Sequence, residues 1–275
     1  MKSSKLAALL ALILHSTDLQ ATALRVITLS PHTTELAYAA GLGDNLVGVS
    51  AYSDYPPQAQ EIEQISDYRS MNIERIVALQ PDLVIAWKGG NPEKQLNQLK
   101  AFNIPIFYSN PKTLEEIAST IEALGKHTAN PSFARAQADE LRSQVAALRK
   151  KYQQRKPISY FYTFDAKSLM TNNGAAWPQP LFSLCGGENI FADSKAAYPM
   201  VNIEEIMARA PQAVFYSTRS KQPLEWQQWQ NLIPAVKNNH VFKLIGDSLG
   251  RPTPRAIQAA EQICQYFDKI RDANS

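Results

Sequence analysis

The chain has 275 residues, of which 45% are hydrophobic and 19% are charged. This balance excludes a disordered or collagen-like chain, and the length suffices for one large or two ordinary domains. The formal net charge is only +3 and no basic run exceeds Arg149-Lys150-Lys151, so the sequence lacks the footprint of a nucleic-acid-binding protein. Two cysteines are too few for a disulfide-dense scaffold or a cysteine-only zinc site.

The first 23 residues have the parts of an export signal. Lys2 and Lys5 precede a nine-residue apolar stretch at 6–14, and an Ala-Thr-Ala cleavage site follows at 21–23. A membrane-anchoring helix is disfavoured because the bilayer core requires about 20 apolar residues. No cysteine follows the apolar stretch, so a lipid anchor is disfavoured too. We expect a mature chain that begins at Leu24 in an oxidising compartment.

Cys185 and Cys264 are the only cysteines. In an exported protein an even number of cysteines predicts a disulfide bond between them. Two unlinked buried thiols are the alternative.

After the signal, short β-branched runs alternate with segments of helical spacing. The predicted strands of the first half are 25–29, 46–49, 82–86 and 104–108. Apolar residues at three- and four-residue steps predict helices around 73–79 and 114–124. This alternation predicts a parallel α/β lobe over residues 24–129.

A long helix is predicted between two such series. Asn130 is a suitable N-cap, Pro131 suits the first helical position and Pro157 ends the segment. A second α/β lobe follows over 157–275, with strands at 158–162, 213–216 and 240–244 and a closing helix at about 253–270. The predicted fold is two Rossmann-like α/β lobes joined by one rigid helix, 130–156, with a ligand cleft between the lobes.

A weak internal repeat supports the two-lobe arrangement. Residues 72–85 (NIERIVALQPDLVI) align with 202–215 (NIEEIMARAPQAVF) at a constant offset of 130. Two lobes of like topology bring loops at the carboxyl ends of their strands together. An exported two-lobed protein of this kind is most simply a solute receptor.

Motifs of catalysis are absent. The sequence has no G-x-S-x-G, G-x-x-x-x-G-K-[ST], H-E-x-x-H or G-x-G-x-x-G segment. His32, His127 and His240 follow the signal, and no two have the spacing of metal ligands on a helix. We therefore predict a binding protein with no enzymatic activity and no metal site.

Aromatic residues in predicted loops are the best candidates for binding a ligand. They are Tyr52, Tyr55, Tyr68, Trp87, Trp177 and Tyr198. Aromatic side chains at strand ends can stack on a large planar ligand while their polar tips bind its rim. Local packing is the alternative for each one taken alone, and only the set favours a binding wall.

Glu74 and Glu204 occupy equivalent places in the two halves of the repeat. Each lies in the first turn of a predicted helix, where a carboxylate interacts favourably with the helix dipole. Two matched carboxylates would also suit pairing with arginines of a two-fold symmetric partner.

Several segments resemble one family. They are 25–41, which contains SPHTTE, and 51–60 (AYSDYPPQAQ), 71–79, 81–91 (PDLVIAWKGGN) and 185–191 (CGGENIF). Together they resemble the cobalamin (vitamin B12) branch of the helical-backbone receptors of metals and cofactors. The resemblance covers essentially the whole mature chain. The SPxxTE, PDLVI and CGGENIF elements are shared with haem, siderophore and metal receptors.

The resemblance implies a monomeric periplasmic receptor that delivers cobalamin, as a transported ligand and not a cofactor, to an ABC importer of two permease and two ATPase subunits. It implies ligand contacts at Tyr52, Tyr68, Trp87, Met170, Tyr198, Asp247, Ser248, Leu249, Gly250 and Arg251. It also implies that Glu74 and Glu204 dock on transporter arginines, and that Cys185 and Cys264 form the disulfide of the family.

This sequence departs from the family at its aromatic wall. Tyr68 and Tyr198 stand where the family places tryptophan, and Met170 falls near a phenylalanine position. Ser248-Leu249-Gly250 lacks the bulky aromatics that are frequent there. Lower affinity or a preference for a cobalamin variant would follow.

Two alternatives remain open. One is a haem or siderophore receptor on the same scaffold with His32, in a loop that faces the cleft by the resemblance, or Tyr52 as the iron ligand. The other is an exported α/β enzyme that modifies corrinoids.

Overall fold

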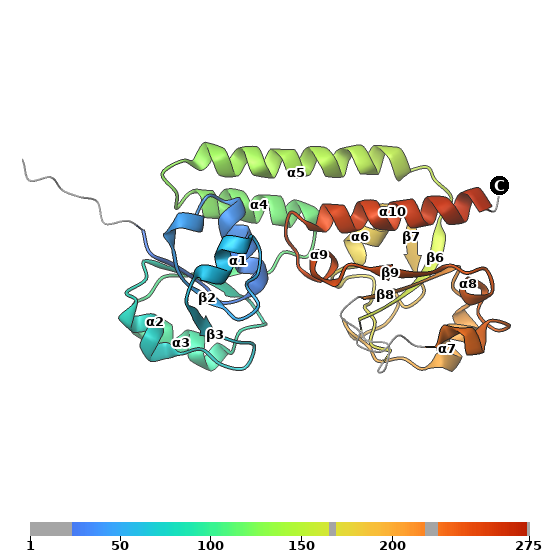
Figure 1. Cartoon of the computed structure of the whole chain (residues 1–275), viewed down its shortest axis with the longest axis horizontal. Helices are drawn as coiled ribbons and strands as arrows, with labels where there is room; N and C mark the ends of the chain where they lie inside the picture. Colours follow the sequence, from blue (N-terminus) through green and yellow to red (C-terminus); the bar gives the residue numbers. More distant parts are fainter. Residues whose placement is uncertain (1–23, 165–168, 218–224, 274–275) are drawn as a thin grey trace, which may run out of the picture.

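The structure is a computed structural model that describes residues 24–164, 169–217 and 225–273. Its elements form two α/β lobes that lie side by side, with α4, α5 and α10 along one side of both (Figure 1). The predicted signal, residues 1–23, lies outside the described residues. In the described ranges no helix combines the length and the hydrophobicity needed to cross a membrane.

The first lobe contains a parallel sheet of five strands in the order β3-β2-β1-β4-β5. The strands are β1 (Val26–Thr28), β2 (Leu46–Ser50), β3 (Gln64–Ser66), β4 (Leu83–Trp87) and β5 (Ile106–Ser109). Its helices are α1 (Pro31–Ala39), α2 (Ile73–Ala78), α3 (Glu93–Ala101) and α4 (Leu114–Gly125), with 3₁₀ turns at Gly43–Asn45 and Pro57–Glu61. The central strands β1 and β4 are buried on both faces except at Trp87, which accounts for their apolar sequence.

The second lobe contains a parallel sheet in the order β7-β6-β8-β9. The strands are β6 (Ile158–Thr163), β7 (Gly187–Asn189), β8 (Ala213–Ser217) and β9 (Val241–Leu244). Its helices are α6 (Gln179–Ser183), α7 (Ile203–Arg209), α8 (Pro234–Lys237), α9 (Gly246–Gly250) and α10 (Ala256–Ala273), with a 3₁₀ turn at Trp226–Trp229. The two parallel sheets confirm the predicted fold class.

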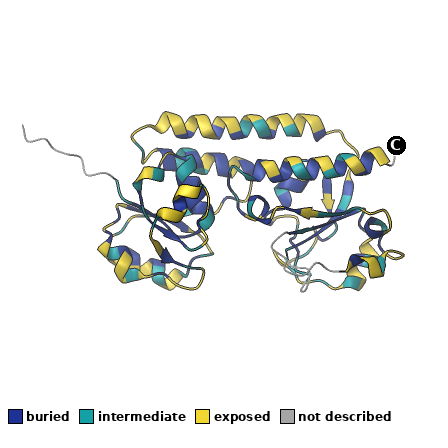
Figure 2. Ribbon diagram, viewed as in Figure 1, coloured by how far each residue is buried: buried dark blue, intermediate teal, exposed yellow. Residues whose placement is uncertain are grey.

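Helix α5 (Pro131–Tyr152) carries the chain from α4 to β6. Asn130 is its N-cap residue and Pro131 its first residue, as predicted, and it ends at Tyr152, a few residues before Pro157. It packs closely on α4. A Cβ atom added to Gly125 of α4 would lie only 2.3 Å from the Cβ of Ala134 on α5, so the absence of a side chain at Gly125 permits this close approach. Its outer face is exposed along its length (Figure 2).

One apolar cluster extends through both lobes. It includes side chains of the two sheets and of α4, α5 and α10, among them Val26, Ile121, Leu141, Phe215 and Phe267. Two smaller clusters cover the other faces of the sheets, one in each lobe. Because the lobes share one core instead of meeting through a flexible linker, a change in their relative orientation would disturb buried contacts.

The predicted disulfide is present. Cys185 and Cys264 are bonded, with Cα atoms 5.0 Å apart, and they join the end of α6 to α10. Arg271 donates to the carbonyl oxygen of Cys185 at 2.7 Å, so α10 is attached to this turn twice.

The internal repeat corresponds to a shared structural unit. Asn72 caps α2 by accepting from the backbone N–H of Arg75 at 3.0 Å, and Asn202 caps α7 by accepting from that of Glu205 at 2.8 Å. Each helix leads into a strand, β4 or β8, beside the first strand of its lobe.

Candidate ligand-binding site

Three of the predicted aromatic residues lie at one edge of the first sheet. Tyr52 follows β2, Tyr68 follows β3 and Trp87 is the last residue of β4. Parallel strands place their carboxyl ends at the same edge. Tyr52 and Tyr68 are each 72% exposed and Trp87 is 43% exposed. Large apolar side chains exposed singly are common, so it is the position of three such rings at one sheet edge that marks a candidate binding surface.

A hollow of about 570 Å³ lies beside the two tyrosines. Its lining residues are Ala51, Tyr52, Ser53, Asp54, Gln60, Gln64, Asp67 and Tyr68. The acid and amide side chains present hydrogen-bonding groups, and the tyrosines supply apolar surface. The hollow therefore offers more polar surface than an ordinary pocket for an organic ligand, and its apolar surface comes mainly from the two tyrosines.

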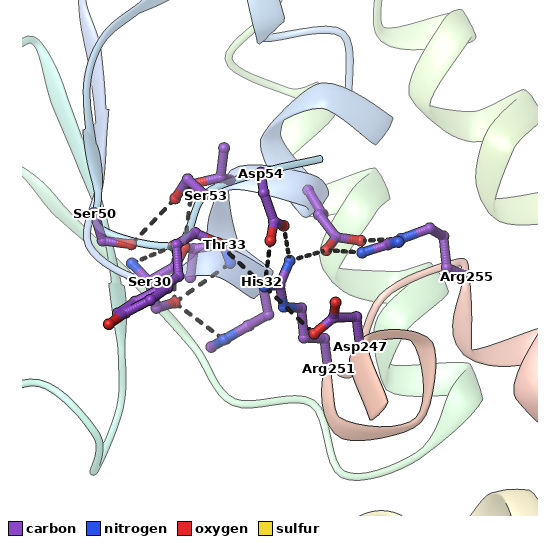
Figure 3. A network of polar contacts seen from close by, with 12 residues as sticks. Ser30, His32, Thr33, Ser50, Ser53, Asp54, Asp247, Arg251 and Arg255 are labelled. Atoms are coloured by element: carbon purple, nitrogen blue, oxygen red, sulfur yellow. Dashed lines mark hydrogen bonds and ion pairs between the residues drawn. The ribbon is translucent and has the colours of Figure 1, made fainter. Parts of the chain in front are cut away.

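Tyr52 occupies a turn with an unusual backbone. Its φ angle is +64°, a left-handed conformation that costs a residue with a Cβ atom about 1 kcal/mol or more. The backbone N–H of Ser53 donates to the carbonyl oxygen of Ser50 at 3.3 Å. The Ser53 hydroxyl lies 2.8 Å from that of Thr34 and 3.2 Å from that of Ser50, so buried hydroxyl groups attach the turn to α1 (Figure 3).

Trp87 is held from its backbone and from two sides of its ring. The backbone N–H of Trp87 donates to Oδ1 of buried Asn91 at 2.7 Å, and the side-chain Nδ2 of Asn91 donates to the carbonyl oxygen of Leu29 at 2.8 Å. The ring of His32 meets that of Trp87 edge-on at 5.4 Å. A Cβ atom on Gly90 would lie 2.1 Å from the Trp87 ring, so the indole rests directly on glycine backbone.

His32 lies in the first turn of α1, not in a loop that faces a cleft, and only 5% of it is exposed. Its Nδ1 is 3.0 Å from the Ser30 hydroxyl, while its Nε2 is buried without a hydrogen-bond partner. Burial, helped by the charge of Arg251, lowers the pKa of His32 to about 3. The imidazole is therefore neutral at any physiological pH, and its burial removes the expected access to iron.

The second lobe contributes a smaller aromatic group. Tyr198 is 50% exposed, and its ring meets that of Phe164 at 5.6 Å. Met170 is half-buried and forms an antiparallel bridge with Met200, which is 75% exposed. Met200 is a further apolar residue beside Met170, and no sequence motif singled it out.

Helix α9 contains the predicted contact loop. The side chains of Ser248 and Leu249 are buried, whereas Asp247 is partly exposed and Gly250 is exposed. The Leu249 carbonyl oxygen accepts from Nε1 of Trp177 at 2.7 Å. Trp177 lies in the turn before α6, in a loop as predicted, but it is only 7% exposed, so for this ring local packing, the alternative to a place on a binding wall, holds. Its ring packs in the core because its one polar atom finds a partner there.

Buried ion pairs join α9 and the start of α10 to the first lobe. Arg251 contacts Glu35 at 3.0 Å and also pairs with Asp54, while Arg255 contacts Glu35 at 2.6 Å (Figure 3). Arg251 and Glu35 are 6% and 4% exposed. The Arg255 guanidinium also lies over the Tyr55 ring at 3.9 Å. Tyr55 therefore packs against a cation on one face of its ring while it remains 42% exposed.

The titration of this cluster follows from its contacts. Partial burial raises the pKa of Asp54, but hydrogen bonding to Arg251 and its charge outweigh that effect and leave the pKa below its ordinary value. Burial lowers the pKa of Arg251, and its bonds to Asp54 and Glu35 more than compensate. Asp54 and Arg251 are thus charged at neutral pH.

Sequence reasoning did not single out Glu35 and Arg255. Glu35 ends the SPHTTE segment, so the motif contained the signal. Its partners, however, lie 216 and 220 residues further along the chain, and no spacing rule connects residues at that distance.

Glu74 and Glu204 are both exposed, in the first turns of α2 and α7. The two helices belong to different lobes, and both lie on the side of the molecule opposite α5 (Figure 1). No three His, Cys, Asp or Glu side chains in the described ranges are grouped in a way that could hold a metal ion.

Two lobes, a shared core and solvent-exposed aromatic rings at strand ends define a solute-binding protein. The sequence profile of the family described as "Periplasmic binding protein" matches residues 26–247. The chain belongs to this family, whose members bind solutes and are not enzymes.

Relatives within the family are similar over nearly their whole length. The chain is 46% identical over 248 residues to the "Vitamin B12-binding protein" of Vibrio parahaemolyticus, covering 90% of each chain. It is 44% identical over 249 residues to the protein of the same name from Yersinia pestis, covering 90% of this chain and 87% of the relative.

Solved structures of periplasmic binding proteins have the same fold as this chain. The crystal structure of the periplasmic vitamin B12 binding protein BtuF of Vibrio cholerae superposes with a TM-score of 0.85 at 46% identity, over 90% of this chain and 97% of that one. The periplasmic haem-binding protein BhuT gives a TM-score of 0.79 at 18% identity, over 90% and 98%. At that identity the likeness concerns the fold alone.

Proposed function

We propose that this protein captures cobalamin in the periplasm and delivers it to an inner-membrane ABC importer. The observation that carries the proposal is the 46% identity to a vitamin B12-binding protein across 90% of the chain, together with exposed aromatic rings where the ligand would sit. Cobalamin is here a transported ligand, and the protein requires no resident cofactor.

In this proposal the rings of Tyr52, Tyr68 and Trp87 form one wall of the site and Tyr198 and Met170 form part of the other. Such a wall suits a broad, partly planar ligand with hydrogen-bonding groups at its rim. Asp247 and the backbone of Ser248, Leu249 and Gly250 would meet the ligand from α9. Of this loop only Asp247 and Gly250 offer more than a slight surface to solvent.

Little lobe closure is expected on binding. The lobes share an apolar cluster and the buried pairing of Glu35 with Arg251. Opening or closing would break contacts of both kinds, and an ion pair that loses one partner inside a protein is costly. The site is therefore preorganised, and a small hinge movement is the most that we expect.

Delivery is proposed to use Glu74 and Glu204. Their exposure on one side of the two lobes suits simultaneous contact with two permease subunits related by a two-fold axis. Charge-assisted hydrogen bonds to arginines would give such a contact its orientation. Export through cleavage of residues 1–23, and a free monomer, belong to the same proposal.

Competition between cobalamin and haem tests the substrate. The chain from Leu24 to Ser275 is mixed with equal concentrations of cyanocobalamin and haemin, and the protein fraction is separated by gel filtration. The absorption spectrum of that fraction identifies the bound ligand. Cobalamin bands alone are expected. Haem bands alone would move the protein to the haem receptors that share this fold.

A further inference from the structure

Tyr52 combines a strained backbone with high exposure. Its φ angle of +64° persists only where surrounding contacts fix the turn, while its ring is 72% exposed and makes none of the ring contacts found among the described residues. The turn therefore has to be held through its backbone and through its neighbours.

One of these contacts comes from the other lobe. Nη2 of Arg251 donates to the carbonyl oxygen of Tyr52 at 3.1 Å. The same guanidinium pairs with Asp54, two residues further on (Figure 3). A planar guanidinium can bind several acceptors at fixed angles. Arg251 thus binds both ends of the segment from Tyr52 to Asp54.

Arg251 is itself positioned by Glu35. The Glu35 carboxylate accepts from Nη1 of Arg251 at 3.0 Å, and it also accepts from Nε and Nη2 of Arg255 at 2.9 and 2.6 Å. Thr34, the preceding residue on α1, holds the Ser53 hydroxyl directly at 2.8 Å. Two consecutive residues of α1 therefore act on one turn, Thr34 by contact and Glu35 through Arg251.

We propose that Glu35 is a positioning residue for the ligand site: it fixes Arg251, which holds the Tyr52 turn in its left-handed conformation and so presents the Tyr52 ring. Arg251 acts in this scheme from behind the ring, which agrees with its burial. The expected effect of Glu35 on cobalamin binding rests on the proposed function. Its expected effect on the backbone of the Tyr52 turn can be measured without any ligand.

The test that needs no ligand is hydrogen exchange in residues 50–55, measured by mass spectrometry on Glu35→Gln. Loss of the charge weakens the hold on Arg251, and amide exchange in that segment is expected to rise about tenfold, in line with opening of a local unit. Arg142→Gln is the control, because Arg142 pairs with Glu115, Glu122 and Asp139 far from the turn. Unchanged exchange in Glu35→Gln would overturn the proposal.

The test with ligand is a double-mutant cycle. Glu35→Gln is expected to weaken cyanocobalamin binding about tenfold alone and less than about twofold in a Tyr52→Ala background, because it acts through that ring. Equal weakening in both backgrounds would overturn the positioning role. If the unaltered protein fails to bind cyanocobalamin, the proposed function fails and the exchange result still decides the inference.

A second variant covers the case in which Glu35→Gln does not fold. Arg251→Lys retains the charge, but a single ammonium cannot hold Glu35, Asp54 and the Tyr52 carbonyl in the same planar geometry. The same rise in exchange at 50–55 and the same dependence on Tyr52 are expected. A folded Arg251→Lys protein with unchanged exchange and affinity would contradict the role given to the guanidinium.

Discussion

Glu35 and Arg251 are 216 residues apart in sequence and form a buried ion pair of 3.0 Å across the two lobes. The pair fixes the second lobe against the turn of the first lobe that carries an exposed aromatic ring. The same contact therefore stabilises the arrangement of the two lobes and helps to set the shape of the candidate site. Removing one partner would leave the other with its remaining pairing, Arg251 with Asp54 or Glu35 with Arg255, so we expect such variants to be destabilised by less than the cost of an uncompensated buried charge, about 3–5 kcal/mol.

Replacing Trp87 with alanine should weaken cobalamin binding by about 1–3 kcal/mol, as for an aromatic anchor at an interface. Isothermal titration with cyanocobalamin measures the change. Phe102→Ala is the matched control, since Phe102 is 56% exposed and lies between the end of α3 and the start of β5, not at the carboxyl end of a strand. An unchanged dissociation constant for Trp87→Ala would remove this ring from the site.

Gly90→Ala should weaken binding by displacing the Trp87 ring, because the added Cβ atom would lie 2.1 Å from it. The fold should remain intact, since the collision is with one partly exposed side chain. In a Trp87→Ala background the same change should have no further effect on affinity, as the affected group is gone. An equal loss in both backgrounds would show that Gly90 serves the ligand in another way.

Glu74→Ala combined with Glu204→Ala should abolish cobalamin uptake and leave binding intact. Both carboxylates are exposed in the first turns of α2 and α7, and neither is among the proposed ligand contacts, so the change removes a docking charge and no ligand contact. Uptake of labelled cyanocobalamin in cells and titration of the purified variant give the two readings. Glu140→Ala with Glu188→Ala, two other exposed acids, is the control. Weakened binding in the first pair would contradict a role limited to docking.

Cys185→Ser with Cys264→Ser should lower the free energy of unfolding by about 4 kcal/mol in the chain-entropy account of a loop this long. The cysteines are separated by 79 residues. Denaturant unfolding of the variant and of the unaltered protein measures the difference. Cobalamin affinity of the folded variant should be unchanged, because the bond lies between α6 and α10. A loss under about 1 kcal/mol would contradict this estimate.

Acid should destabilise the protein in part through His32. Its pKa is lowered from 6.5 to about 3 by burial and by Arg251, so between these values the unfolded chain binds a proton that the folded protein does not. The free energy of unfolding then falls as the pH drops below 6.5, by about 2 kcal/mol at pH 5 from this residue. His32→Gln should remove that component from the pH dependence of unfolding. Identical pH profiles for the two proteins would contradict it.

Much of the fold could be predicted because its central strands are continuous apolar runs. The strands predicted at 82–86 and 158–162 match β4 and β6 to within a residue. Strands β3 and β7 could not be predicted, since each has three residues with polar members and lies at a sheet edge with a single neighbour. Edge strands of this length have neither periodicity nor burial to mark them.

The site was predictable as a set of aromatic residues but not in its supporting contacts. Tyr52 and Trp87 are exposed at strand ends as their position after apolar runs suggested. Trp177 has the same kind of sequence neighbourhood, yet it is buried because the Leu249 carbonyl oxygen, 72 residues away, binds its indole N–H. Contacts at such separation depend on how the elements of the lobe pack on one another, which the local sequence pattern does not specify.

Whether this protein is a cobalamin receptor can be decided by isothermal titration of residues 24–275 with cyanocobalamin, with haemin in parallel. We expect tight binding of one cobalamin per chain and no specific heat with haemin. Binding of haemin without any heat from cyanocobalamin would contradict this expectation, leaving the fold in place and the ligand wrongly assigned.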